Sequence, residues 1–285
     1  MRLLIVNADD YGLTDGIARA VLDAHHRGVV TSTSLIATGP AFARTVRWLD
    51  DAPELATGMH FAAVGEDPPV LSAREVPSLV DRNGLFPLTW RQFVLRAIRG
   101  AIDPDDLRRE FLAQLELVRS IGRPITHADA HQHLHLWPLV GRVLIEIAGA
   151  HAIPAVRLPR GGGRSITTAG VATLRSRAAT RITNAQLITT DDSVGISIAG
   201  RLTPDRFARV MDGFLRRSVN SAELTVHPGL DPDPQRSRYT WGFAWAQEHA
   251  TLCAPATRAR IDADGWTLGS YNDLAPQRKE HLASV

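Results

Sequence analysis

The chain opens with MRLLIVNADD, residues 1–10, in which the apolar run Leu3–Val6 leads almost at once to two acids, Asp9 and Asp10. This run is too short for the apolar core of a signal peptide, and acidic residues follow it closely. A short continuous apolar run of this kind is typical of a buried strand in a parallel sheet. We therefore expect a strand at Leu3–Val6 that carries both carboxylates at its carboxyl end.

Short apolar or β-branched runs alternate with longer segments of helical period along the rest of the chain. This alternation predicts parallel strands joined by crossover helices, an α/β fold. The architecture we expect is a distorted or incomplete (β/α) barrel, in which active groups lie at the carboxyl ends of the strands. The expected strands are 3–6, 29–36, 55–61, 125–128, 155–158, 194–198 and 223–226, and the expected helices are 14–24, 41–49, 104–122, 137–150, 204–215 and 243–252.

Length and composition agree with one enzyme-sized domain. The 285 residues, 44% of them hydrophobic, can bury the core of one barrel, so we expect a single domain over residues 1–285 with a surface insertion around 65–88. A net charge of +2, with scattered arginines, argues against nucleic acid as a partner. The single cysteine, Cys253, cannot form an internal disulfide, and no stretch is long and apolar enough for a membrane span. We expect a cytoplasmic protein.

Two glycine-bearing and acidic stretches have simpler interpretations than a functional site. The run Gly161–Gly163 lacks the spacing of a nucleotide-binding fingerprint, so we interpret it as a mobile loop. The pair Asp9-Asp10 precedes Tyr11-Gly12 and could on its own be a turn or a helix cap. Its position at the end of a predicted strand is equally consistent with catalysis, so the pair alone leaves both interpretations open.

The segment HADAHQHLH, residues 127–135, is the densest group of metal-binding side chains in the sequence. His127, Asp129, His131, His133 and His135 occupy alternate positions directly after a predicted strand. In an extended backbone these side chains would face one way and offer ligands for a divalent metal together with groups that orient them. A histidine-rich surface loop is the alternative. A catalytic site uses about three protein ligands and keeps a position open, so the others must orient ligands or line the cleft.

Three further residues are candidates for this site. His60 ends the predicted strand 55–61 and is the natural distant ligand. His227 ends the strand 223–226 before Pro228-Gly229 and is a candidate general acid, although a lone histidine is more often structural. Arg157 either lines the cleft or lies on the surface.

The order and spacing of these motifs resemble the YdjC-like carbohydrate deacetylase family, which includes chitooligosaccharide deacetylases and hopanoid-biosynthesis-associated members. The resemblance covers essentially the whole chain, including a typical ending at residues 265–274. It implies a distorted (β/α) barrel that is commonly a homodimer. The matching motifs are Asn7-Ala8-Asp9-Asp10-Tyr11-Gly12, Gly58-Met59-His60, the segment 127–135 and His227-Pro228-Gly229.

By motif, the resemblance assigns a role to each central residue. It implies that Asp10, His60 and His127 hold one divalent metal ion, that Asp9 is the catalytic base and that His227 is the acid. The ion would be magnesium or zinc, because two imidazoles and a carboxylate suit zinc without excluding magnesium. Around this set we expect residues that orient the ligands or contact an N-acetylated sugar substrate, namely Asp129, His131, His133 and Arg157.

The expected reaction is hydrolysis of the N-acetyl group of a sugar, which releases acetate. After His60 the sequence Phe61-Ala62-Ala63 departs from the family pattern, which leaves the sugar open. Two other functions remain as alternatives. One is metal-dependent hydrolysis of another amide or of a phosphoester, and the other is a catalytically silent sugar-binding protein.

Overall fold

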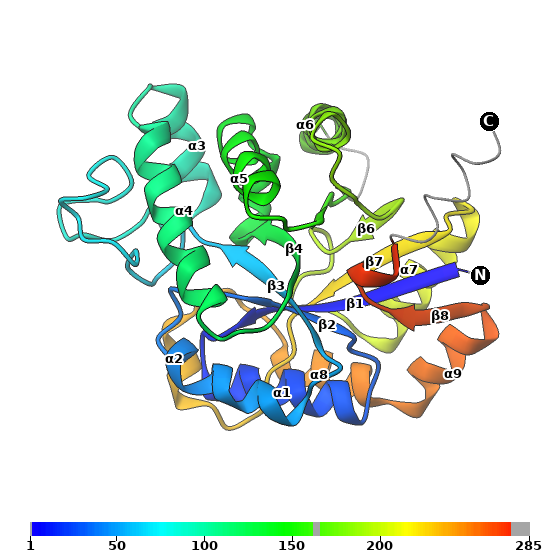
Figure 1. The fold of residues 1–285 in the computed structure, drawn as a ribbon. Coiled ribbons are helices and arrows are strands. Elements are labelled where there is room, and N and C mark those ends of the chain that lie inside the picture. The colour runs from blue at the N-terminus through cyan, green and yellow to red at the C-terminus, as the bar shows by residue number, and fades with distance from the viewer. Residues whose placement is uncertain (1, 162–165, 275–285) are drawn as a thin grey trace.

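The computed structural model describes residues 2–161 and 166–274 of the chain. Within them the strands form one parallel sheet in the order β5-β4-β3-β2-β1-β7-β6, with β8 also paired to β1 (Figure 1). The sheet curls with helices on its outside, so the predicted α/β class and distorted barrel are confirmed. The strands are β1 Arg2–Tyr11, β2 Ser32–Leu35, β3 Ala56–Phe61, β4 Ile125–Ala130, β5 Ala155–Val156, β6 Asp192–Val194, β7 Ser221–Val226 and β8 Trp266–Gly269.

The helices surround the curled sheet on its outer face. In Figure 1, α1, α2 and α8 lie below the sheet, and α3, α4, α5 and α6 lie above it. The sequence patterns did not predict α3, α6 or α9, and Gly162 and Gly163 of the predicted loop fall outside the described residues. The helices are α1 Asp15–His26, α2 Phe42–Thr45, α3 Trp90–Ile98, α4 Pro104–Arg119, α5 Pro138–Ala150, α6 Ile166–Asn184, α7 Pro204–Arg216, α8 Trp245–Cys253 and α9 Pro255–Ala263.

Residues 65–88, the expected insertion, contain no helix or strand and lead into α3. They are anchored by buried apolar side chains such as Val76, Leu79 and Phe86. Two backbone N–H groups of the segment, those of Val70 and Leu71, donate to the buried carboxylate of Glu110 on α4. None of the helices in the described ranges is long and apolar enough to cross a membrane.

The curl of the sheet brings its two outer strands together. Isolated parallel bridges join Ala155 to Ile188 and Arg160 to Val194, so the chain around β5 meets the chain around β6. The Arg160 N–H donates to the Ser193 carbonyl at 2.8 Å. The carboxyl ends of the strands therefore face one another around a common end of the barrel, where enzymes of this architecture place their active groups.

β1 lies at the centre of this arrangement. Leu4, Ile5 and Val6 are fully buried, as expected for a strand that reads as a continuous apolar run. β7 pairs along one edge of β1, while β8 pairs with its first residues and β2 with its later ones. The predicted strand at Leu3–Val6 is thus confirmed, and it extends through both acids to Tyr11.

A β-bulge interrupts β1 where the two acids lie. Ala8 pairs with Thr33 and Tyr11 pairs with Leu35, so β1 contains one residue more than β2 over this stretch. Asp10 adopts a positive φ of 68°, which aspartate tolerates better than most residues. A bulge re-aims the side chains around it, and here it lets Asp9 and Asp10 serve different parts of the site.

The chain after β4 departs from the extended backbone that the alternating histidines predicted. β4 ends at Ala130, and residues 131–136 form a 3-10 turn. Gln132 and His133 both have positive φ, at 52° and 53°. The prediction that all the histidines of 127–135 face one way is therefore wrong, because the alternation of side chains ends with the strand.

Gly58 on β3 packs directly against the ring of His127. A Cβ atom at Gly58 would lie 2.1 Å from His127 Cε1, and this ring has no room to move because it is fully buried and stacks on Tyr271. Gly58→Ala should therefore lower the free energy of unfolding by roughly 1–3 kcal/mol. Denaturant unfolding measures this change in the free energy of unfolding. The matched control is Gly149→Ala on an exposed turn of α5, where a Cβ meets nothing within 4 Å and stability should hold or rise. Equal midpoints for the two variants would contradict the packing described.

Candidate active site

A cavity of about 290 Å³ opens at the carboxyl ends of the strands. It is lined by polar residues on one side and by aromatic and apolar residues on the other. Of the nine site residues predicted from sequence, six line it, and the other three, His127, Asp129 and Arg157, do not. The lining consists of Asp9, Asp10, His60, Trp90, His131, Gln132, His133, Ile196, Ala199, His227, Trp241 and Phe243.

Asp10, His60 and His131 bring three ligand atoms together at the base of this cavity. Asp10 Oδ1 lies 3.1 Å from His131 Nδ1 and 3.4 Å from His60 Nε2, and the two ring nitrogens are 3.3 Å apart. Donors bonded to one ion at about 2.1 Å are separated by roughly 3–3.5 Å, so the three atoms fit the corners of a coordination shell. Each residue comes from a different strand end, β1, β3 and the turn after β4.

Two further features fit a cation at this position. Asp10 Oδ1 is buried and makes no hydrogen bond in the described part of the chain, which is costly for a carboxylate oxygen. Burial acts to raise the pKa of Asp10, but His131 and His60 outweigh it and hold the pKa far below its usual range. The carboxylate is therefore ionised and lacks a partner that a divalent ion would provide.

His127 does not join this group, contrary to the role implied by the resemblance. Its Nε2 lies 3.1 Å from Ser34 Oγ and its Nδ1 lies 3.0 Å from Thr126 Oγ1, so both ring nitrogens are engaged. Burial lowers the pKa of His127 to about 3, and the ring is therefore neutral. Because its ring packs under Tyr271 inside the barrel, His127 is a core residue in this structure.

Asp129 orients His60 rather than meeting substrate. The His60 Nδ1–H donates to Asp129 Oδ1, which leaves Nε2 directed at Asp10 and His131. This carboxylate–histidine pair is the usual support for a metal-binding imidazole. Burial acts to lower the pKa of His60, but Asp129, Asp9 and Asp10 together raise it to about 10. The surrounding field therefore favours positive charge at His60.

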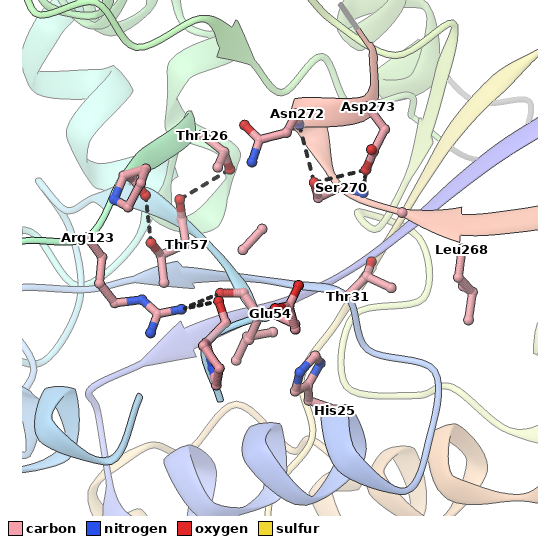
Figure 2. Close-up of a pocket in the computed structure, with 15 residues that line it drawn as sticks. His25, Thr31, Glu54, Thr57, Arg123, Thr126, Leu268, Ser270, Asn272 and Asp273 are labelled. Atoms are coloured by element: carbon pink, nitrogen blue, oxygen red, sulfur yellow. Dashed lines mark hydrogen bonds between the residues drawn. The ribbon is translucent and has the colours of Figure 1, made fainter. Parts of the chain in front are cut away.

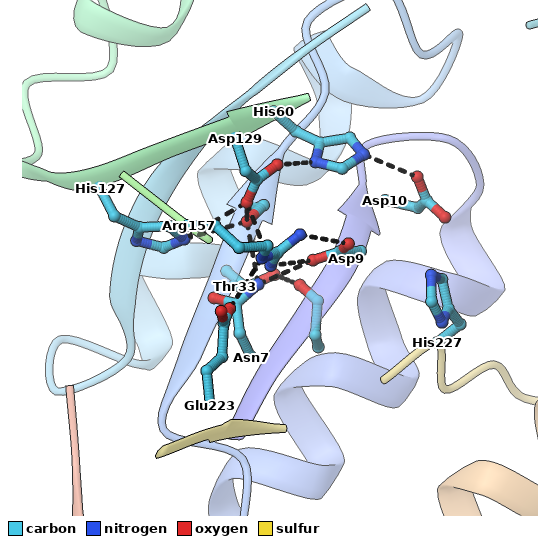
Figure 3. Close-up of polar contacts among 12 residues, drawn as sticks. Asn7, Asp9, Asp10, Thr33, His60, His127, Asp129, Arg157, Glu223 and His227 are labelled. Atoms are coloured by element: carbon cyan, nitrogen blue, oxygen red, sulfur yellow. Dashed lines mark hydrogen bonds and ion pairs between the residues drawn. The ribbon is translucent and has the colours of Figure 1, made fainter. Parts of the chain in front are cut away.

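Arg157 is buried inside the barrel and acts as an anchor for carboxylates (Figure 3). Its guanidinium donates to both oxygens of Asp9 at 2.8 and 2.7 Å and to Glu223 Oε1 at 2.9 Å. It also lies 3.1 Å from Asp129 Oδ2. Arg157 therefore neither lines the cavity nor lies on the surface, and its contacts fit the expectation that it belongs to the residues that orient the ligands.

Asp9 is fixed by these contacts yet still lines the cavity. Besides Arg157, Asn7 Nδ2 donates to Asp9 Oδ1 at 2.8 Å. Hydrogen bonds from three donor atoms, two on Arg157 and one on Asn7, hold the carboxylate in one orientation. Asp9 therefore presents an oriented carboxylate beside the Asp10 group without belonging to that set of ligands.

Sequence reasoning missed Glu223, Ser34 and Tyr271. Glu223 is fully buried on β7, where its Oε2 accepts from Ser193 Oγ at 2.9 Å and from the Tyr271 hydroxyl at 2.8 Å. A glutamate inside the strand 221–226 was a signal, because a charge in a buried strand needs a partner. Ser34 carries no comparable signal, although its hydroxyl donates to Asp129 Oδ2 at 2.7 Å.

His227 faces the cavity from the end of β7. Its backbone N–H donates to Glu248 Oε2 on α8 at 2.6 Å, and its ring contacts Phe243 edge-on at 5.0 Å. The ring Nδ1 is buried and makes no hydrogen bond within the described ranges. Figure 3 shows His227 and His60 on opposite sides of Asp10. A proton donor at His227 would therefore reach a substrate from the side away from His60.

The other two predicted histidines of the segment occupy different places. His133 lines the cavity, and burial lowers its pKa well below the usual value, so the ring is neutral. His135 is buried, and its Nδ1 accepts the backbone N–H of Ala130 at 3.1 Å, which fixes the turn after β4. His131 therefore serves as a ligand candidate instead of an orienting group, His133 contributes to the wall, and His135 is structural.

Aromatic rings form the outer wall of the cavity. Trp241 contacts His131 at 5.2 Å between ring centroids and Phe243 at 5.4 Å. Trp90, at the start of α3, is 42% exposed at the cavity rim, and its backbone N–H donates to Gln132 Oε1 at 2.8 Å. These rings offer flat apolar surfaces next to polar groups, as ligand sites commonly do.

A larger cavity of about 490 Å³ lies at the other end of the barrel (Figure 2). It is bounded by the amino ends of β3 and β4 and by the chain after β8. The guanidinium of Arg123 in its wall donates to the carbonyls of Leu49, Ala52, Pro53 and Leu55, so its charge serves to join loops. Because this end of a barrel usually contributes stability, the smaller cavity is the candidate active site.

Comparisons with known proteins agree with this geometry. A carbohydrate deacetylase from Geobacillus stearothermophilus is 33% identical over 273 residues, which is 96% of this chain and 98% of that protein. A carbohydrate deacetylase from Homo sapiens is 33% identical over 305 residues, covering 96% and 92% of the two chains. Both relatives are thus matched over nearly their whole length.

A solved structure and a family profile complete the comparison. The crystal structure of an Enterococcus faecalis V583 protein, described as a candidate cellobiose-phosphate cleavage protein, superposes with a TM-score of 0.80 at 24% identity and covers 96% of this chain and 98% of that one. At that identity it shows the fold alone. The profile of the family described as YdjC-like protein matches residues 3–263. The chain therefore belongs to the YdjC-like family.

Proposed function

We propose that this protein is a metal-dependent carbohydrate deacetylase that hydrolyses the N-acetyl group of a sugar to acetate and a free amine. The observation that carries the proposal is the convergence of Asp10, His60 and His131, with mutual donor distances of 3.1–3.4 Å, beside the oriented carboxylate of Asp9. The 33% identical carbohydrate deacetylases support the substrate class. The aromatic wall supports a sugar, because the apolar face of a sugar ring packs well against indole and phenyl rings.

Asp10, His60 and His131 would hold one divalent cation. When bound, such an ion supplies a Lewis acid that polarises the amide carbonyl and makes water more acidic. Two imidazoles and one carboxylate favour zinc or another imidazole-preferring ion over magnesium, which prefers oxygen ligands. Only three protein ligands converge, so room remains for water and substrate.

Asp9 is the general base of this proposal. Its carboxylate accepts a proton from the attacking water while Arg157 and Asn7 keep it pointed into the cavity. Arg157 also prevents Asp9 from turning toward the cation, because both carboxylate oxygens are bonded to the guanidinium. This division explains why two adjacent acids are needed, because Asp10 binds the cation and Asp9 accepts the proton.

His227 is the general acid. The departing amine must gain a proton as the carbon–nitrogen bond breaks, and a ring nitrogen at the cavity wall can supply it. The Glu248 carboxylate holds the His227 backbone, and Phe243 supports the ring. The acid and the base thus approach the scissile amide from different strands, β7 and β1.

Acetate release from N-acetylglucosamine, its oligomers and lipid-linked derivatives tests the function. Chelator-sensitive release from any of them is the expected result. Turnover of a phosphoester or a non-sugar amide without acetate release would favour the alternative hydrolase, and no turnover of any kind would favour a silent sugar-binding protein. Homodimerisation and a cytoplasmic location remain predictions.

Metal binding distinguishes His131 from His127. His131→Gln should lose one equivalent of bound cation and nearly all activity, since it removes one of three ligands. His127→Gln should keep that equivalent, because His127 contacts Ser34 and Thr126 instead. Metal analysis of the dialysed variants measures both. Loss of metal from His127→Gln with retention in His131→Gln would restore the ligand set first expected from the sequence.

Variants of the two neighbouring acids should separate cation binding from turnover. Asp10→Asn should lose the cation and activity together, whereas Asp9→Asn should retain the cation and lose activity by several orders of magnitude, since an amide cannot accept the proton of water. Metal content and acetate release are measured on the same samples. A metal-free Asp9→Asn protein that is still folded would show that Asp9 is a ligand and that its assigned role as base is incorrect.

His227→Ala should keep the cation and slow acetate release by roughly two to four orders of magnitude, as expected for loss of a positioned proton donor. The rate should recover most with substrates whose leaving amine is least basic, because such amines need protonation least. His26→Ala is a suitable control for loss of a histidine, because His26 is exposed at the end of α1, and it should leave the rate unchanged. Nearly full activity in His227→Ala would show that His227 is not the acid.

A further inference from the structure

A second group of metal-binding side chains lies where α1 packs against α8, outside the cavity described above. Asp23 is on α1, and His249 and Cys253 are one turn apart on α8. Residues four apart on a helix share a face, so both α8 side chains point at Asp23. The family comparisons and the proposed deacetylation give this cluster no role.

The three donor atoms converge on one point. His249 Nε2 lies 2.7 Å from Asp23 Oδ2 and 3.5 Å from Cys253 Sγ, and Sγ lies 3.9 Å from the same Asp23 oxygen. In a relay that activates a thiol, aspartate and sulfur would contact opposite nitrogens of the imidazole. Here Asp23 Oδ2 and Cys253 Sγ both lie next to His249 Nε2, so the three donor atoms form a triangle like the one that ligands form around an ion.

The distances match a small thiophilic cation. Zinc bonds of about 2.0 Å to nitrogen and oxygen and about 2.3 Å to sulfur place tetrahedral donors roughly 3.3–3.6 Å apart. The two contacts of Cys253 are already close to this range. The Asp23–His249 pair would have to open by roughly 0.6 Å, which a partly exposed aspartate side chain can do by rotation.

Arg27 is the competing partner of Asp23. Its guanidinium donates to both carboxylate oxygens, at 2.6 and 2.5 Å, but its side chain is 66% exposed. An exposed ion pair is worth at most about 1 kcal/mol, far less than a zinc site with a thiolate ligand contributes. A divalent ion bound by one carboxylate and one thiolate leaves the cluster neutral, so Arg27 would not be repelled.

Solvent access and protonation are also compatible with binding. Asp23, His249 and Cys253 are all partly exposed, so an ion can enter from solvent and water can complete its shell. Burial raises the pKa of the Cys253 thiol, and the neighbouring carboxylate of Asp23 acts in the same direction. The thiol therefore carries its proton at neutral pH, and this proton would be released when the cation binds.

We propose that Asp23, His249 and Cys253 form a second metal site, which takes a zinc-like divalent cation and clips α8 to α1. The residue before His249 is Glu248, whose carboxylate accepts the His227 N–H. A clip at this position would therefore stiffen the helix that supports His227. The proposal stands independently of the proposed function, because it involves none of the residues that line the active-site cavity.

Cobalt(II) titration tests the site directly, because cobalt bound to a thiolate shows a sulfur-to-metal charge-transfer band in the near ultraviolet. The sequence contains one cysteine, so any such band reports on Cys253. The full chain should show the band, and His60→Ala, which lacks a ligand of the first site, should keep it. Cys253→Ser should lose the band while retaining one equivalent of cobalt at the first site. His249→Ala should lower the affinity of the Cys253 site for cobalt about tenfold or more, so that the band appears only at higher cobalt concentration.

Thiol reactivity provides a second measurement that does not depend on a spectrum. Zinc should slow the reaction of Cys253 with a disulfide reagent by about tenfold or more in the unmodified chain, and by much less in His249→Ala and Asp23→Ala. Absence of the cobalt band together with zinc-independent thiol reactivity would overturn the proposal. A band that survives unchanged in both His249→Ala and Asp23→Ala would also overturn it, since cobalt would then be bound by the thiol alone.

Discussion

The guanidinium of Arg157, fully buried inside the barrel, is the interaction on which the rest of the site depends. Removing a charge from water costs several kcal/mol, and the cost is offset only when the charge is closely paired and hydrogen-bonded. Carboxylates from β1, β4 and β7 meet this need together, through Asp9, Asp129 and Glu223. These strands are separated in sequence, so the group forms only when the sheet has curled.

The same carboxylates create the electrostatic character of the active site. Three carboxylates around one guanidinium leave a surplus of negative charge. Asp129 brings this charge next to His60, with which it shares a hydrogen bond. The high pKa of His60 follows from this surplus, and His60 and His131 in turn hold the pKa of Asp10 below its usual range. Cation binding at the mouth of the barrel is thus favoured by charges in its interior, of which Asp129, Arg157 and Glu223 do not line the cavity.

Backbone geometry then assigns different tasks to adjacent residues. The bulge in β1 separates Asp9, held by Arg157, from Asp10, which faces the two imidazoles. His131, directly after β4, reaches Asp10, and two successive residues with positive φ then redirect the rest of the histidine segment. Such conformations cost energy and persist where surrounding contacts determine them, as functional sites often require. Support from outside the sheet also matters, because Glu248 on α8 fixes the backbone of His227.

The sequence by itself determined the α/β class, the first strand, most crossover helices and the family, since each depends on local periodicity or on motif spacing. It also indicated which motifs meet, because parallel strands bring their carboxyl ends to one edge. Only the tertiary structure decided which side chains of those motifs touch. Alternation within β4 shows that His127 and Asp129 share a face but not what that face packs against, so it could not show that His127 lies in the core. Alternation also ends with the strand, so it could not place His131 beside Asp10 and His60. It also could not show the burial of Arg157, because that depends on carboxylates from strands far apart in the chain.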